Sequence, residues 1–150
     1  MTKKILLIML ALFLSQCGYE KIYSSKNINL SINKIKKENN IINNELSNAL
    51  LEILSDKTSD NIYDLEIQNK KFTEIKSKDS KGDPSVYVLK LETKIIATSK
   101  GKEYENIILK EMNYNNNDDK FELSQYIGEI EKILIKETVQ EIINYLTDIR

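Results

Sequence analysis

One side chain in this sequence is placed for covalent chemistry, the thiol of Cys17, which is the only cysteine in the chain. It follows two early lysines and an unbroken apolar run from Ile5 to Leu14. This order is typical of an export signal, and the run is too short for a permanent membrane span, which needs about 20 apolar residues. Because a cysteine at this place can accept a lipid on its sulfur, residues 1–16 are predicted to be a lipoprotein signal peptide, cleaved between Gln16 and Cys17.

Lipid on Cys17 would make residues 17–27 an acylated linker and the membrane a partner of the chain. More than one acyl chain, palmitate among them, meets the requirement for stable anchoring. Gly18 follows the cysteine where an aspartate would favour retention in the inner membrane, so the expected location is the outer membrane, facing the periplasm. Gln16 departs from the small residue usual before such a cysteine. An incidental cysteine, on an uncleaved tether or a plain secretory signal, is the alternative.

Composition predicts a folded domain and excludes several functions. The chain is 41% hydrophobic and 30% charged, which is typical of a globular protein. It has no histidine, so it lacks the usual catalytic pairs and an imidazole metal ligand, and we expect no enzyme, no metal and no cofactor. With 22 basic and 23 acidic residues it carries no positive excess for nucleic acid. The predicted C-terminal helix contains four glutamates that fit a solvent-exposed face rather than a catalytic site: Glu129, Glu131, Glu137 and Glu141.

Periodicity of the apolar residues predicts six elements after the linker. In chain order they are a strand at residues 28–32, a helix at about 40–55, a strand around 63–67, a strand at 86–99, a strand at 104–114 and a helix from about 123 to near the end. Ser124 is a plausible N-cap of the last helix. The order β-α-β-β-β-α predicts one α/β domain of the α+β type over residues 28–150. Its four-stranded, mainly antiparallel sheet would be covered by two helices in a two-layer sandwich.

Several short features occur in an order that resembles the LPS-assembly lipoprotein family, LptE. They are Cys17-Gly18-Tyr19 after the signal, a helix ending near Leu54, the entry Asp83-Pro84-Ser85-Val86-Tyr87-Val88-Leu89 into a long strand, a hairpin ending at Tyr114, and the closing helix. The resemblance implies an outer-membrane lipoprotein that plugs the β-barrel LptD, assists its assembly and supports insertion of lipopolysaccharide into the outer leaflet. The implied partners are an LptD-type barrel and lipopolysaccharide.

Four lysines on or beside the predicted hairpin, Lys90, Lys94, Lys100 and Lys102, are candidates for contact with lipopolysaccharide phosphates. A solvated strand face and a charged turn explain the same lysines without any ligand, and that interpretation is favoured. The alternative function is a free, periplasm-facing lipoprotein that binds a lipid, a peptide or a cell-wall ligand in a groove between sheet and helices.

Overall fold

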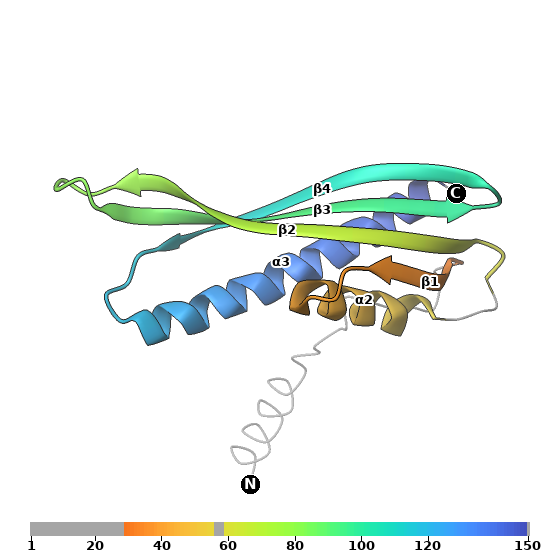
Figure 1. The fold of residues 1–150 in the computed structure, drawn as a ribbon, viewed down its shortest axis with the longest axis horizontal. Coiled ribbons are helices and arrows are strands. Elements are labelled where there is room, and N and C mark those ends of the chain that lie inside the picture. The colour runs from red at the N-terminus through yellow and green to blue at the C-terminus, as the bar shows by residue number, and fades with distance from the viewer. Residues whose placement is uncertain (1–28, 56–58, 150) are drawn as a thin grey trace, which may run out of the picture.

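The computed structural model describes residues 29–55 and 59–149 (Figure 1). Its elements are β1 (Ser31–Lys37), α2 (Ile41–Leu54), β2 (Ile62–Lys78), β3 (Pro84–Ser99), β4 (Lys102–Asn115) and α3 (Lys120–Asp148). The predicted signal peptide and linker, with Gln16 and Cys17, lie outside the described residues. None of the described helices is long and apolar enough to cross a membrane.

The strands form one mixed sheet in the order β1-β2-β3-β4. β1 and β2 are parallel, whereas β2–β3 and β3–β4 are antiparallel hairpins. Parallel neighbours require a long crossover connection, and α2 provides it. Between β3 and β4, Lys100 and Gly101 both have positive φ, as a two-residue turn of the hairpin kind requires. The predicted α+β class, element order and mainly antiparallel sheet are confirmed.

All four strands differ from their predicted bounds, β3 and β4 by only one or two residues at an end, β1 and β2 by more. β1 begins and ends later than the pattern at residues 28–32 indicated, and it continues through Lys37. β2 extends to Lys78, far past the last residue of its apolar alternation, Ile67. Its second half has mostly exposed side chains and is held by pairing with β3, from Gln68↔Lys94 to Lys78↔Pro84. Apolar and polar residues alternate along a strand when one of its faces is buried. A strand with both faces exposed shows no such alternation and is not recognised from sequence.

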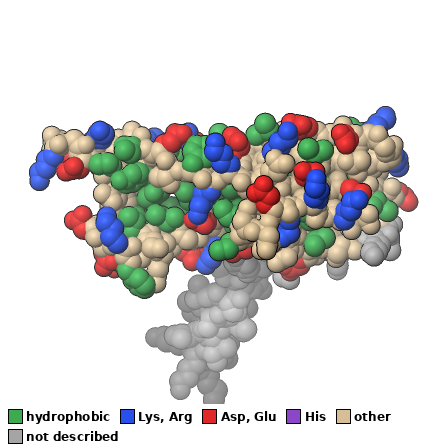
Figure 2. Space-filling model, in the orientation of Figure 1, with side chains coloured by type: hydrophobic (Ala, Val, Ile, Leu, Met, Phe, Trp, Pro, Cys, Tyr) green, Lys and Arg blue, Asp and Glu red, His purple; other side chains and the backbone are tan. Residues whose placement is uncertain are grey.

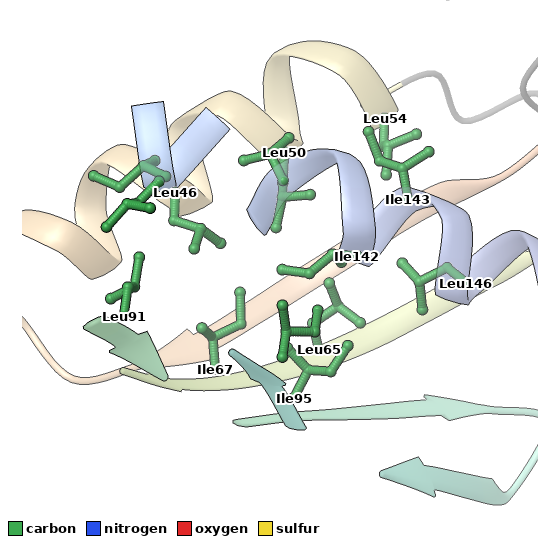
Figure 3. Packing of buried hydrophobic residues seen from close by; sticks show 14 of the residues in the cluster. Leu46, Leu50, Leu54, Leu65, Ile67, Leu91, Ile95, Ile142, Ile143 and Leu146 are labelled. Carbon is green, nitrogen blue, oxygen red and sulfur yellow. The ribbon is translucent and has the colours of Figure 1, made fainter. Parts of the chain in front are cut away.

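Both helices lie against one face of the sheet, and the core fills the space between the layers (Figures 1 and 3). In α2, Leu46, Leu50 and Leu54 recur every fourth residue and form one buried stripe. They pack with buried side chains of α3 and of the sheet, which include Ile142, Ile143, Leu146, Leu65, Ile67, Leu91 and Ile95. Full burial of one such side chain contributes about 1.5–3 kcal/mol, so this cluster is the main source of stability.

A buried polar ladder joins α2 to two strands. The Thr93 hydroxyl donates to the side-chain oxygen of Asn69, and the Asn69 amide donates to the side-chain oxygen of Asn43 at 2.5 Å. Asn43 in turn donates to the backbone oxygen of Glu38 at 3.0 Å. Asn43 and Thr93 have no exposed surface, and buried polar groups need such partners. The ladder therefore fixes where α2 begins over the sheet, beside the end of β1.

The first turn of α3 corrects the predicted cap. Asp119 is the N-cap, and its carboxylate accepts hydrogen bonds from the backbone N–H groups of Phe121 and Glu122 at 2.9 and 3.1 Å. Ser124 lies inside the helix, so its prediction as the cap is wrong. The helix begins earlier because Asp119 satisfies two N–H groups at once, although the residues that follow it add little buried apolar surface.

Three contacts hold α3 against the sheet besides the core. Lys71 of β2 and Lys110 of β4 form ion pairs with Glu131 and Glu141, at 2.6 and 3.3 Å. The Tyr145 hydroxyl donates to the backbone oxygen of Glu105 at 3.1 Å. Burial raises the pKa of Tyr145, and the neighbouring Glu105 adds to the increase. Two of the four glutamates predicted to form a solvated face are thus engaged with the sheet.

Candidate functional site

The face of the sheet that points away from the helices carries two of the four candidate lysines. Side chains alternate between the faces of a strand, and on β3 the odd-numbered ones from Leu89 to Ala97 are buried against the helices. Lys90 and Lys94 are even-numbered and therefore lie on the outward face. The register places them beside β2 and β4 residues of the same face, such as Phe72 opposite Lys90 and Ile107 opposite Lys94.

Lys90 and Lys94 are already engaged by groups of this chain. The Lys90 ammonium lies 2.7 Å from the Glu74 carboxylate and 3.8 Å from that of Glu111, and 5.9 Å from the centre of the Phe72 ring. The hydrogen bond with Glu74 is the main reason that the pKa of Lys90 is raised. Lys94 pairs with Glu105 at 2.8 Å. An anion would have to compete with these carboxylates for either ammonium.

Lys100 and Lys102 lie at the end of the sheet, in and just after the β3–β4 turn, and both are exposed. Neither has an ion pair within the part of the chain that the structure describes. Lys100 is ten residues along the chain from Lys90, a length of about 33 Å in a strand. The four candidates therefore do not form one cluster, and only the turn pair offers unengaged positive charge.

The outward face also carries apolar side chains that the sequence pattern did not single out. Ile107 and Leu109 of β4 are 58% and 51% exposed, whereas Ile108 between them is buried against the helices. Half-buried Ile96 of β3 belongs to the same face. Three apolar residues in succession within a strand force at least one outward, and that signal could have identified this surface.

A small cavity lies between the sheet and the helices, where a ligand groove was the predicted alternative. At the seam between the helices and the sheet is a cavity of about 10 Å³, lined by Ile42, Lys71, Leu89, Leu91, Glu131, Leu134 and Ile135. That volume holds about one water molecule. A larger depression of about 370 Å³ lies beside the β4–α3 connection, where Asn115, Asn116, Asn117, Glu122, Leu123 and Tyr126 line it. Its lining combines three asparagines with Leu123 and Tyr126, and the only charged residue, Glu122, accepts a hydrogen bond from Asn117. The described residues contain no cluster of acidic side chains able to hold a metal ion.

Comparison of the whole fold is more informative than any single pocket. No protein-family model matches the sequence, and no curated protein matches it. Solved structures do match. The crystal structure of rare lipoprotein B from Shewanella oneidensis has a TM-score of 0.55 at 14% identity, and the match covers 78% of this chain and 98% of that one. This chain shares the fold of rare lipoprotein B.

Two further lipoprotein structures match to a similar extent. Lipoprotein B from Nitrosomonas europaea, solved by NMR, has a TM-score of 0.59 at 14% identity, with 77% of this chain and 83% of that chain covered. The minor lipoprotein from Acinetobacter baumannii has a TM-score of 0.55 at 13% identity, with 77% and 92% covered. All three proteins are bacterial lipoproteins by name.

Proposed function

We propose that this protein is an outer-membrane lipoprotein that sits inside an LptD-type β-barrel as a plug, assists assembly of that barrel and supports lipopolysaccharide insertion into the outer leaflet. The observation that carries the proposal is the match to rare lipoprotein B over 98% of that chain, since LptE is rare lipoprotein B. Cys17 behind an export signal supplies the expected membrane anchor.

The surface of the domain supports a plug role. A barrel lumen is largely polar, and the outward face of the sheet is dominated by charged residues in ion pairs, Lys90 with Glu74 and Lys94 with Glu105. Exposed Ile107 and Leu109 interrupt this polar face and provide apolar contact area for a barrel wall. A plug needs a stable shape rather than a reaction centre, and the absence of histidine from the chain agrees with that role.

Of the candidate contacts for lipopolysaccharide, the turn pair Lys100 and Lys102 is better suited to phosphate than Lys90 and Lys94. The turn lysines are exposed and have no carboxylate to displace, whereas the strand lysines are held by Glu74, Glu111 and Glu105. Charge-assisted bonds to phosphate gain most when the cation does not first lose a partner. The alternative, a free lipoprotein with a ligand groove, predicts stoichiometric binding of a small amphiphile without a barrel partner.

Photo-crosslinking in the native envelope tests the plug role directly. A photoreactive residue is placed, one at a time, at exposed Leu109 on the outward face, at Ile133 on α3 and at Lys81 in the β2–β3 turn. A plug is surrounded by its partner, so all three positions should crosslink to the same large β-barrel. Crosslinks to a barrel from one position only, or from none, would contradict the proposal.

Two controls separate the parts of the proposal. A photoreactive residue at buried Leu50 should give no crosslink to another protein, because that side chain is enclosed by the core. Cys17→Ser should abolish labelling by a fatty-acid probe, and retention of the label would refute the lipoprotein assignment. A chain that is labelled but never crosslinks to a barrel would be a free lipoprotein.

A further inference from the structure

The two halves of β2 differ in what lies along their outer edge. β1 pairs with β2 from Ser31↔Ile62 to Lys37↔Ile67 and then leaves the sheet for α2. Beyond Ile67, β2 continues to Lys78 with β3 on one side and no strand of the described chain on the other. We name residues 68–78 the open edge. It lies on the same side of β2 as β1, beyond the point where β1 ends.

Pairing geometry shows which backbone groups of the open edge point outward. Ser31 donates to the backbone oxygen of Asn61, so odd-numbered residues of β2 point toward β1. Even-numbered residues therefore pair with β3, because the two sides alternate along a strand. The register runs without a shift as far as Ile75, so the N–H and C=O groups of Asn69, Lys71, Thr73 and Ile75 point outward. None of these backbone groups donates or accepts a hydrogen bond with another described residue; only the side chains of Asn69 and Lys71 are engaged.

The other edge of the sheet, on β4, is treated differently. The backbone oxygen of Glu105 accepts the Tyr145 hydroxyl at 3.1 Å, and the side chain of Asn106 accepts the N–H of Ile107 at 2.9 Å. These two bonds occupy outward groups in the middle of β4, which makes pairing with a further strand costly. Proteins ordinarily blunt exposed edges with lysines, bulges or a covering element. The open edge of β2 has lysines and a bulge after Ile75, but no hydrogen bond to its outward backbone groups within residues 29–55 and 59–149.

Charge and apolar surface along the open edge restrict what can pair with it. Residues 68–78 include the four lysines Lys70, Lys71, Lys76 and Lys78 against the single acid Glu74. Lys71 is paired with Glu131, but the other three lysines still outnumber Glu74, so a second copy of the same edge is repelled. On the face of the helices, Ile75 is 51% exposed and half-buried Ile42 borders the small cavity at the seam. Figure 2 shows hydrophobic side chains gathered in the half of the molecule that α2 does not cover.

We propose that the open edge of β2 accepts an extended segment of another protein as a fifth strand, in line with β1. The segment alternates apolar with acidic side chains. The apolar ones face the helices beside Ile75 and Ile42, and the acidic ones meet Lys70 and Lys76, whose ammonium exchanges its 3.0 Å hydrogen bond with the Asn113 side chain for the new carboxylate. Main-chain hydrogen bonds to Asn69, Lys71, Thr73 and Ile75 supply the common recognition, as in other cases of strand addition. This site needs no barrel, and its test is separate from that of the plug role.

A synthetic peptide tests the edge directly. The probe is a seven-residue peptide of alternating glutamate and valine with both ends capped, and the control peptide has lysine in place of glutamate. Amide hydrogen exchange of the full chain in detergent is followed by NMR. The acidic peptide should slow exchange at Asn69, Lys71, Thr73 and Ile75 by at least about tenfold at saturation, whereas the lysine peptide should not. Protection of β4 amides instead, or no protection, would overturn the proposal.

Matched variants identify the bonds that matter. Thr73→Pro removes one outward N–H and should weaken peptide binding by about tenfold, while Leu109→Pro removes an outward N–H of the β4 edge and should leave binding unchanged. If either proline variant fails to fold, Lys70→Glu combined with Lys76→Glu replaces it. That variant should lose the acidic peptide and gain the lysine peptide, and an unchanged preference would refute the site.

Discussion

The sheet has a covered half and an open half, and different forces hold them. In the covered half, from β1 to about Ile67, helices bury one face and side chains such as Leu65 and Ile95 are almost fully enclosed. In the open half, β2 from Gln68 onward has mostly exposed side chains and is held by its ladder with β3. Apolar burial dominates the first, and backbone pairing with local bonds dominates the second. The difference teaches that one strand can be a core element at one end and a docking edge at the other.

The largest expected contrast is between two truncations of apolar side chains. Leu50→Ala empties a fully buried position of the covered half and should lower the free energy of unfolding by about 2–5 kcal/mol. Ile75→Ala removes a half-exposed side chain of the open half and should change it by no more than about 0.5 kcal/mol. Urea unfolding followed by circular dichroism measures both. Equal losses would mean that the open half is covered in the isolated protein.

A smaller effect is expected at the boundary between the halves, where the polar ladder crosses. Asn43→Ala leaves the half-buried amide of Asn69 without its acceptor and should cost about 1–3 kcal/mol, while the Glu38 carbonyl keeps its hydrogen bond from the Asn40 N–H. Asn48→Ala on the exposed side of the same helix is the control and should be close to neutral. The same unfolding assay compares them. A neutral Asn43→Ala would show that water replaces the ladder and that α2 is positioned by its leucines alone.

The covered half is easier to predict from the sequence than the open half, because only the covered half is buried on one face. The leucine stripe of α2 and the alternation of β3 indicate the covered half correctly, because burial leaves a period in the sequence. Residues 68–76 of β2 leave none, so their strand could not be recognised before its pairing with β3 was known. Bonds between residues far apart in the chain, such as Asn43 with Asn69, likewise have no local pattern.

The candidate site is also only partly predictable from the sequence. Lys90 and Lys94 could be placed on a strand from the alternation around them, but their carboxylate partners come from neighbouring strands and depend on register. Ile107 and Leu109 were not predicted to be exposed, because three successive apolar residues show that one face is apolar outward without telling which of the three is buried. A residue's own chemistry is visible in sequence, whereas its partners across a sheet are not.

The smallest expected change in stability concerns the first turn of α3, which lies beside the open half. Its first turn has little burial to hold it, since Phe121 is 71% exposed, so the cap made by Asp119 should matter. Asp119→Ala should lower the free energy of unfolding by about 0.5–2 kcal/mol, with the loss concentrated in hydrogen-exchange protection of the first turn. Ser124→Ala should be neutral or slightly stabilising, because alanine is the better helix former. A larger loss from Ser124→Ala than from Asp119→Ala would instead place the start of the helix where the apolar pattern indicated it, and the first turn would then fray in solution.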